Sequence, residues 1–500
     1  MRTIVQTGIV AGITSLSLAF PVAADISAIE ARNEIVGFYE SFGYTVDIGS
    51  EKISDGALLL DDVSIQVDIP DGKGQIVIAY DWVKMTETGG AVDITFPDTI
   101  EITGNVDDEG KEAVFAAHID ATNMAINLSG SMDNLRIRTN MDIGQAVLDR
   151  MTVENKDIPL TALINFGKTT ADYTIVKADG DRRQLSGTAS IASLGVVADA
   201  KEPDGDGFFN FNVLIADLTY GFTADIPKVD NPDDLLKAGL AGSGQMSYGN
   251  GSAEINFANK GDRFAMTSSA VNGRLDVGLT PDLITYDVGG SGVKMTISSS
   301  DIPLPSVEMA YDDAEIAFNM PLSPGQEPKP FAAKVALRGV TVGESLWALI
   351  DSGKVLPRDP ATVVVDLSGT AMVLANLMDP ENLAEMKGPP MLPVSLNLNE
   401  LTASIAGALL NGSGEVKFNF QNPNTINGIP APAGEVNLSL KGGFGLLDKL
   451  VSLRLVPEET ATGLRAMLGA FAKPVGDDQF ESKIEISEDG SIKANGQRIK

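Results

Sequence analysis

The chain has a single histidine, His118, so a Ser-His-Asp triad would have to use this residue as its base. His118 lies between Ala117 and Ile119 in a strand-like segment. Alternation of apolar and polar residues there puts Ile119 on the buried face and His118 on the polar face. We find no Gly-x-Ser-x-Gly, phosphate-loop or His-Glu-x-x-His motif in the sequence. We therefore predict that the protein is not an enzyme, and we assign no catalytic residue.

The carboxylates of the chain could in principle bind a cation or cleave a glycoside. Asp204 and Asp206, in the segment DGDG, resemble half of a calcium loop, but the later bidentate Glu is missing. A second acidic group follows at 312–315. Solvated turns account for both groups, so we predict no metal ion and no cofactor, with calcium as the alternative. A glycosidase needs only two carboxylates in a cleft, but 2 Trp and 8 Tyr offer few sugar-stacking surfaces.

Composition narrows the possible partners. The 500 residues include 68 acidic and 37 basic side chains, which gives a formal net charge of -31. This charge repels a phosphate backbone and an anionic lipid surface, so we expect no nucleic acid partner. A hydrophobic content of 43% supports a folded core. The absence of cysteine excludes disulfide bonds and thiol chemistry.

The first 24 residues have the features of a secretory signal peptide. Arg2 provides a positive charge, the stretch 4–20 is uncharged and mostly apolar, and Val22 and Ala24 are small residues at a cleavage site. We therefore expect cleavage after Ala24 and a periplasmic protein. An uncleaved membrane anchor is the alternative, but the apolar stretch is short for a membrane span. No later stretch approaches 18 apolar residues, so we expect no transmembrane anchor after cleavage.

Beyond Tyr44 the dominant hydrophobic period is two residues, which is typical of strands with one buried and one wet face. Turn signals such as Asn250-Gly251 and Asn411-Gly412 separate closely spaced strands and favour hairpins. The sequence therefore predicts a mainly β protein with a long, curved, largely antiparallel sheet or sheets. The alternation is clearest in the segments 63–69, 76–80, 92–96, 124–128, 293–297, 316–320, 363–367, 394–398, 416–420 and 436–440.

A few short amphipathic helices interrupt this pattern. Ser27 and Glu30 form a capping box before an N-terminal helix, and Thr341 and Glu344 have the same spacing at the start of a helix-rich middle insert over 341–387. Further helix starts are indicated near 231 and 379. A helical hairpin is predicted near the C-terminus, and its second helix should bury a stripe at i, i+3, i+4 and i+7, namely Leu464, Met467, Leu468 and Phe471.

One domain boundary is indicated. The stretch PLSPGQEPKP at 321–330 is rich in proline and could separate an N-terminal β-rich lobe (25–320) from a C-terminal α+β lobe (331–500) that carries the helical hairpin. An ordinary surface loop explains the same stretch equally well.

Four segments in the last third of the chain resemble one family. They are LPRDPATVVVDLSGTA at 356–371, GSGEVKFNF at 412–420, GIPAPAGEVNLSLKGGFGLLDKLVSLRLVPEETATGLRAMLG at 428–469 and DGSIKANGQRIK at 489–500. They are similar to the bacterial domain of unknown function 2125, a family of exported envelope proteins. The resemblance is specific over about 340–500 and looser elsewhere. It implies an envelope protein with no established activity and no catalytic residues to carry over.

That family is in turn loosely similar to AsmA-like proteins, which are β-rich envelope proteins implicated in lipid handling. The chain departs from the AsmA pattern, because it carries an expected cleavable signal where those proteins keep an inner-membrane anchor. It is also much shorter than the members thought to bridge two membranes.

Two functional hypotheses follow from these features. In the first, the protein binds a lipid or another apolar small molecule along one face of a sheet. In the second, it is an envelope scaffold or interaction protein with a filled β core and no ligand, and its protein partners are unknown. A few short helices cannot cover so many strands, so the sheet must close, pack as a sandwich or stay open to a ligand. Candidate residues for the ligand face are Val394, Leu396, Leu398, Val416, Phe418 and Phe420.

Overall fold

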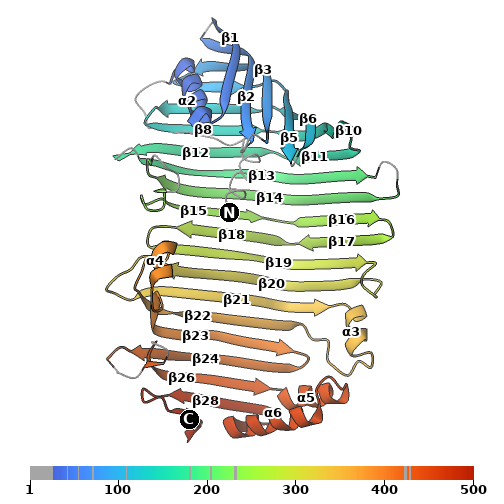
Figure 1. The fold of residues 1–500 in the computed structure, drawn as a ribbon, viewed down its shortest axis with the longest axis vertical. Helices are drawn as coiled ribbons and strands as arrows, with labels where there is room; N and C mark the ends of the chain where they lie inside the picture. The colour runs from blue at the N-terminus through green and yellow to red at the C-terminus, as the bar shows by residue number, and fades with distance from the viewer. Residues whose placement is uncertain are drawn as a thin grey trace. The chain divides into compact units, whose positions relative to one another are not determined.

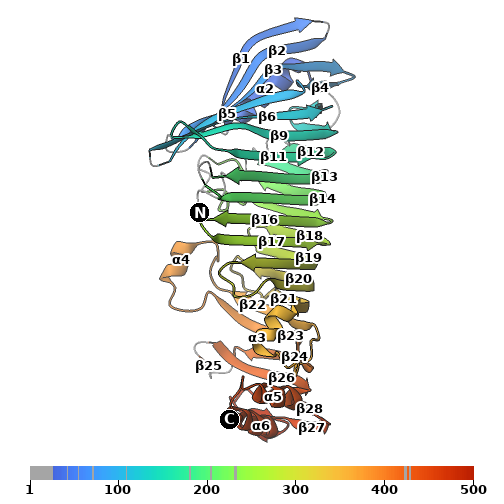
Figure 2. The same cartoon turned by 90° about the vertical axis from the view of Figure 1, so that its right-hand side faces the viewer.

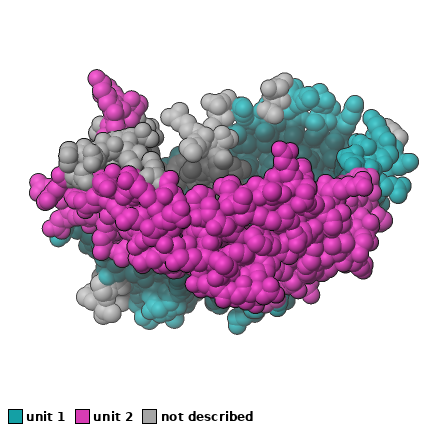
Figure 3. Space-filling view, turned by 90° about the horizontal axis from the view of Figure 1, so that it is seen from below, with its two compact units in different colours: residues 1–267, 299–301 teal, residues 268–298, 302–500 magenta. Residues whose placement is uncertain are grey.

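The computed structural model describes residues 26–499 apart from short gaps at 42, 55, 70–72, 109, 180–181, 203–204, 230–233, 422–424 and 427–428. The expected signal peptide lies outside the described residues. The chain forms two compact units, which Figure 3 colours separately. Unit 1 contains residues 1–267 and 299–301, and unit 2 contains residues 268–298 and 302–500.

The described part of unit 1 starts with a helix, which is followed by strands. Its elements are α2 (Ala28–Ser41), β1 (Thr45–Ser54), β2 (Ala57–Ile69), β3 (Gly74–Thr88), β4 (Ala91–Thr95), β5 (Thr99–Asp108), β6 (Lys111–Thr122), β7 (Ala125–Ser131), β8 (Asn134–Met141), β9 (Ile143–Val153), β10 (Lys156–Asp157), β11 (Leu160–Phe166), β12 (Thr169–Ala178), β13 (Arg182–Lys201), β14 (Phe208–Ile226), β15 (Ala241–Tyr248) and β16 (Gly251–Asn259). The strand β17 (Asp262–Ala270) crosses the boundary between the units.

The sheet of unit 1 divides and joins again. β1, β2 and β3 pair in order, and β3 then pairs with β5 through its first half and with β4 through its second half. One branch continues through β6, β9 and β11, and the other through β7, β8 and β12. Both branches end on the long strand β13, which pairs with β14. All of these pairs are antiparallel, as the hairpin spacing of the sequence predicts.

The main core of unit 1 lies between α2 and the sheet. Ala31 of α2, Val92 of β4 and Leu128 of β7 are each at most 1% exposed in this core. The predicted capping box is formed, because the Ser27 backbone N–H donates to Glu30 Oε2 at 2.9 Å and the Glu30 N–H donates to Ser27 Oγ at 3.3 Å. These bonds satisfy free backbone groups at the start of the helix and lower the pKa of Glu30.

Unit 2 is built on strands that pair with their neighbours in chain order, with short helices between some of them. Its elements are β18 (Asn272–Leu279), β19 (Leu283–Ser299), β20 (Val307–Pro321), β21 (Lys329–Val342), α3 (Glu344–Ile350), β22 (Ala361–Val373), α4 (Pro380–Glu385), β23 (Met391–Ile405), β24 (Ala408–Asn419), β25 (Thr425–Ile426), β26 (Ile429–Lys441), α5 (Gly443–Ser452), α6 (Glu458–Phe471), β27 (Lys473–Gly476), β28 (Gln479–Ile486), β29 (Ile492–Ala494) and β30 (Gln497–Arg498).

Figures 1 and 2 show the long strands of unit 2 side by side from β19 to β24. Each is antiparallel to the next, and β24 continues to β26 and β28. The prediction of a mainly β protein with a large antiparallel sheet and a few short helices is therefore confirmed. Among the described residues, no helix is both long and apolar enough to cross a membrane.

Several local predictions were wrong. The second capping box is not formed, because Gly343 is the N-cap of α3 and makes no side-chain hydrogen bond. Glu344 Oε2 instead lies 3.3 Å from Lys354 Nζ, and Glu344 Oε1 lies 3.5 Å from Arg358 Nε. The strand β22 runs through the expected helix-rich insert. The expected helix start at 231–233 lies outside the described residues, and residues 235–239, which follow it, form a turn.

The C-terminal helical hairpin exists as α5 and α6, but its expected apolar stripe is not buried. Leu464 and Met467 are 48% and 58% exposed, and the residue of α6 that is buried is Ala461. The position of α5 is fixed by Asp478, whose carboxylate accepts the Phe444 and Gly445 N–H groups at 2.9 and 2.8 Å.

The proline-rich stretch does not divide the compact units. The boundaries between the two compact units lie near residues 268 and 302, whereas residues 321–330 lie inside unit 2. It connects β20 to β21, and these strands are paired. Pro321 ends β20, Lys329 and Pro330 begin β21, and the residues between them connect these two strands within one sheet.

Candidate functional site

The central strands of unit 2 carry an apolar face. Val288 of β19, Ile316 of β20, Val335 of β21 and Val365 of β22 are successive cross-strand partners. Directly paired residues of antiparallel strands point to the same side of the sheet. We use the term apolar face for this row and the rows beside it, which together comprise Tyr286, Val288, Ala314, Ile316, Phe318, Ala333, Val335, Leu337, Val363, Val365 and Leu367.

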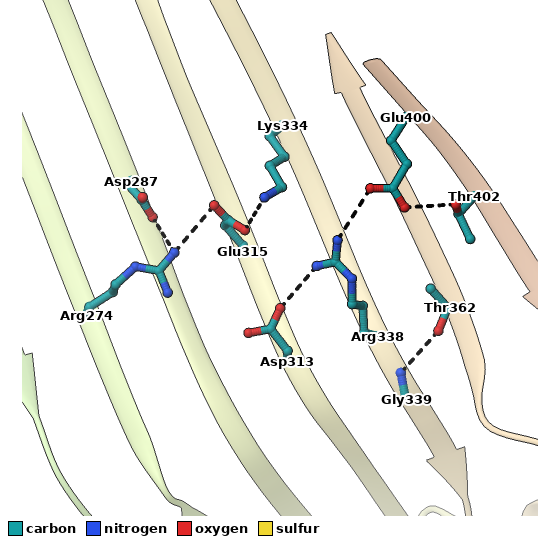
Figure 4. A network of polar contacts seen from close by, with 10 residues as sticks. All are labelled: Arg274, Asp287, Asp313, Glu315, Lys334, Arg338, Gly339, Thr362, Glu400 and Thr402. Carbon is teal, nitrogen blue, oxygen red and sulfur yellow. Dashed lines mark hydrogen bonds and ion pairs between the residues drawn. The ribbon is translucent and has the colours of Figure 1, made fainter. Parts of the chain in front are cut away.

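The opposite side of the same strands is polar and ion-paired, as Figure 4 shows. Arg274 Nη2 lies 3.0 Å from Asp287 Oδ1 and 3.4 Å from Glu315 Oε1, and Lys334 Nζ lies 2.8 Å from Glu315 Oε2. Arg338 extends this ion-paired face, because its Nη1 lies 3.3 Å from Asp313 Oδ2 and its Nη2 lies 3.8 Å from Glu400 Oε2. Basic side chains of β18 and β21 thus flank the acidic side chains of β19 and β20, and these ion pairs stabilise the register of the strands.

The apolar residues of the two faces differ in their exposure to water. On the apolar face, Ile316, Val335 and Val363 are 50%, 51% and 51% exposed. On the ion-paired face, Ala336 and Val364 are 2% and 0% exposed. These two residues are cross-strand partners in the row of Glu315. Large apolar side chains are therefore half exposed on one side of the sheet, whereas small and medium apolar side chains are buried on the other.

The residues that the sequence suggested for ligand binding lie in the neighbouring strands. Leu396 and Leu398 of β23 pair with Gly369 and Leu367 of β22, so both point to the apolar face. Val416 of β24 pairs with Leu396, and Phe418, two residues further on, shares this side. These four side chains are half-buried.

The other two candidates depart from this row. Val394 lies at a β-bulge, between the paired residues Pro393 and Ser395, so the register gives it no partner on β22. Phe420 follows the end of β24 and is 47% exposed.

Sequence reasoning missed the most exposed part of the apolar face. Ile316 and Phe318 were recognised as strand residues but not as candidates for ligand binding, and Val335 and Leu337 were not singled out. The signal was available, because all of them alternate with polar or small residues. Alternation identifies which residues share a face, but it does not show whether another element covers that face.

His118 lies in unit 1 in a polar setting, as predicted. Its Nδ1 is 2.8 Å from Asp149 Oδ1, and its Nε2 is 3.5 Å from Asp120 Oδ2. Asp120 in turn accepts a hydrogen bond from the Thr99 hydroxyl at 2.7 Å. The hydrogen bond to Asp149 is the main cause that raises the pKa of His118. This arrangement explains the histidine as part of a surface hydrogen-bond network.

The acidic residues considered above as calcium ligands do not form a cation site among the described residues. Asp204 lies outside the described residues. Asp313 and Glu315 belong to the ion-paired face of unit 2, where they contact arginine and lysine. Within the described ranges, no group of three or more His, Cys, Asp or Glu side chains is arranged to hold a metal ion.

The chain was compared with family models, with curated proteins and with solved structures, and none of the three comparisons found a match.

Proposed function

We propose that this protein binds the apolar part of a lipid, or of a similar molecule, along the apolar face of unit 2, and that it does so in the bacterial periplasm without catalysing a reaction. The observation that carries the proposal is the exposure of cross-strand neighbours. Ile316, Val335 and Val363 are about half exposed, while Ala336 and Val364 on the ion-paired side of the same strands are 2% and 0% exposed. An exposed row of large apolar side chains marks a binding surface more often than a chance feature.

The energetics favour an acyl chain as the ligand. Burial of an acyl chain contributes about 0.8 kcal/mol per methylene, so a chain that is only partly covered by the face still binds. The net charge of -31 opposes the approach of anionic head groups to the protein. We expect the chain to lie on the face and the head group to stay in water.

The sequence supports the same proposal. The expected signal peptide gives a periplasmic address, and the resemblance to an exported family that is loosely AsmA-like implies lipid handling. The alternative is an envelope scaffold whose apolar residues only pack against protein. The half-exposed row favours the ligand hypothesis, because side chains packed under another layer of protein are at most 9% exposed, as are the buried residues between α2 and the sheet in unit 1.

Binding of a fluorescent fatty acid tests the proposal. Purified protein should bind the probe saturably, and unlabelled oleate should displace it. An acidic substitution on the apolar face, Val335→Asp, should weaken binding at least tenfold. The matched control is Ala317→Asp, which adds the same charge on the ion-paired face opposite Lys334 and should leave binding unchanged.

Two results would support the scaffold hypothesis instead. In the first, the probe binds no better than to an unrelated acidic β protein, and solvent extraction of the purified protein yields no lipid. In the second, Val335→Asp and Ala317→Asp change binding equally, because the site then does not lie on the apolar face.

A further inference from the structure

Unit 1 contains a partly open cavity between α2 and the sheet, with a volume of about 110 Å³. Its wall is mostly apolar, with Ile35 and Tyr39 from the helix and Ile48, Tyr80 and Met124 from the sheet side. An engineered apolar cavity of about 150 Å³ holds benzene in another protein. The cavity here therefore has room for a short alkyl segment.

One cationic side chain, Arg32 of α2, also lines this cavity. Its Nη2 lies 2.8 Å from Glu51 Oε2, but its Nε is buried and has no hydrogen-bond partner among the described residues. A buried donor without a partner is unfavourable. A ligand oxygen at this position would satisfy the donor.

The other polar side chains of the wall are Tyr39 and Tyr80, whose neutral hydroxyl groups do not repel an anionic ligand. Burial raises the pKa of Tyr39 and of Tyr80, so both stay neutral at physiological pH. The cavity thus combines an apolar interior with one positive group, in a protein whose net charge is -31. Mostly apolar pockets with a few convergent polar groups are typical of small-molecule sites.

We propose that this cavity binds a medium-chain carboxylate, with the carboxylate on the guanidinium of Arg32, the adjoining alkyl segment against Ile48 and Met124, and the rest of the chain extending through the open side of the cavity. Glu51 competes with the ligand carboxylate for Arg32. The site is separate from the apolar face of unit 2, and its residues all belong to unit 1.

Calorimetric titration of the full-length protein with decanoate tests this proposal, with 1-decanol as the neutral probe of equal chain length. Arg32→Gln should weaken decanoate binding at least tenfold and leave decanol binding unchanged. Glu51→Gln should tighten decanoate binding severalfold, because it frees Arg32; a gain in affinity does not arise from misfolding. Met124→Trp should fill the cavity and weaken the binding of both probes.

The matched control is Ala317→Asp on the ion-paired face of unit 2, which lies in neither proposed site and should leave decanoate binding unchanged. A result in which the wild-type protein binds neither probe overturns the proposal. Equal effects of Arg32→Gln on decanoate and decanol overturn the role of Arg32. If Val335→Asp abolishes decanoate binding while Met124→Trp does not, the ligand binds in unit 2 and the cavity is not its site.

Discussion

Ile316 on β20 and Val335 on β21 are direct cross-strand partners, and each leaves half of its side chain exposed to water. Two large apolar residues in contact on a sheet normally lie under another layer of protein. Their exposure, together with the charged layer on the opposite side of the same strands, gives unit 2 a sheet whose apolar side is the accessible one.

The adjacent residues Val363 and Val364 of β22 allow a matched test of this difference in exposure between the two faces. Val363 is 51% exposed on the apolar face, whereas Val364 is 0% exposed beneath the charged layer. The nearly isosteric change Val364→Thr buries a hydroxyl and should cost about 1–3 kcal/mol of unfolding free energy. Val363→Thr should cost about 0.5 kcal/mol or less. Denaturant unfolding of the two variants measures the difference, and equal costs would show that both faces are covered.

The single histidine gives a prediction that one NMR signal can test. The hydrogen bond that His118 Nδ1–H donates to the Asp149 carboxylate raises the pKa of His118 above its ordinary value of 6.5. The histidine therefore contributes its full stabilisation below pH 6.5 and loses it as the pH rises through the raised pKa. Titration of the imidazole resonance in Asp149→Asn should give a pKa closer to 6.5 than in the wild type. An unchanged pKa would contradict the hydrogen bond to Asp149.

The loop after α3 depends on a buried carboxylate. Asp351 is 1% exposed and accepts hydrogen bonds from the Val355 and Leu356 N–H groups and from Arg358, whose guanidinium lies 4.2 Å from the ring centroid of Trp347. Burial alone would raise the pKa of Asp351, but these hydrogen bonds outweigh it and lower the pKa.

Because the pKa of Asp351 is lowered in the folded protein, its contribution to stability is present above its unfolded value and is lost as the pH falls through the folded value. We expect Asp351→Asn to lower the Tm at neutral pH and to reduce the loss of Tm in acid. Thermal unfolding over a pH series measures both effects. A variant whose Tm falls in acid as steeply as that of the wild type would show that Asp351 is not the titrating group.

The sequence predicted the strands well but not their environment. Alternation places Leu396 and Val416 on one face, and the register confirms this because the two residues are paired. In the run Val363–Val365, however, both sides of the strand are apolar, so alternation cannot distinguish the exposed valine from the covered one. Burial of one valine and not the other depends on residues outside this run, about which alternation within one strand carries no information.

Helix starts show the same limit. Ser27–Glu30 and Thr341–Glu344 have identical spacing, but only the first pair forms a capping box. The Glu344 carboxylate instead contacts Lys354 and Arg358, which follow the end of α3 and are not part of the capping-box pattern. The cavity beside Arg32 was also missed, since an amphipathic helix indicates a buried side but not how completely that side is filled.

The most direct test of ligand binding on the apolar face uses single cysteines, because the chain contains none of its own. Ile316→Cys and Ala317→Cys place an environment-sensitive fluorophore on opposite sides of β20. With oleate, we predict a saturable blue shift of the label at 316 and no shift of the label at 317. Equal responses at the two positions, or no response at 316, would contradict binding on the apolar face.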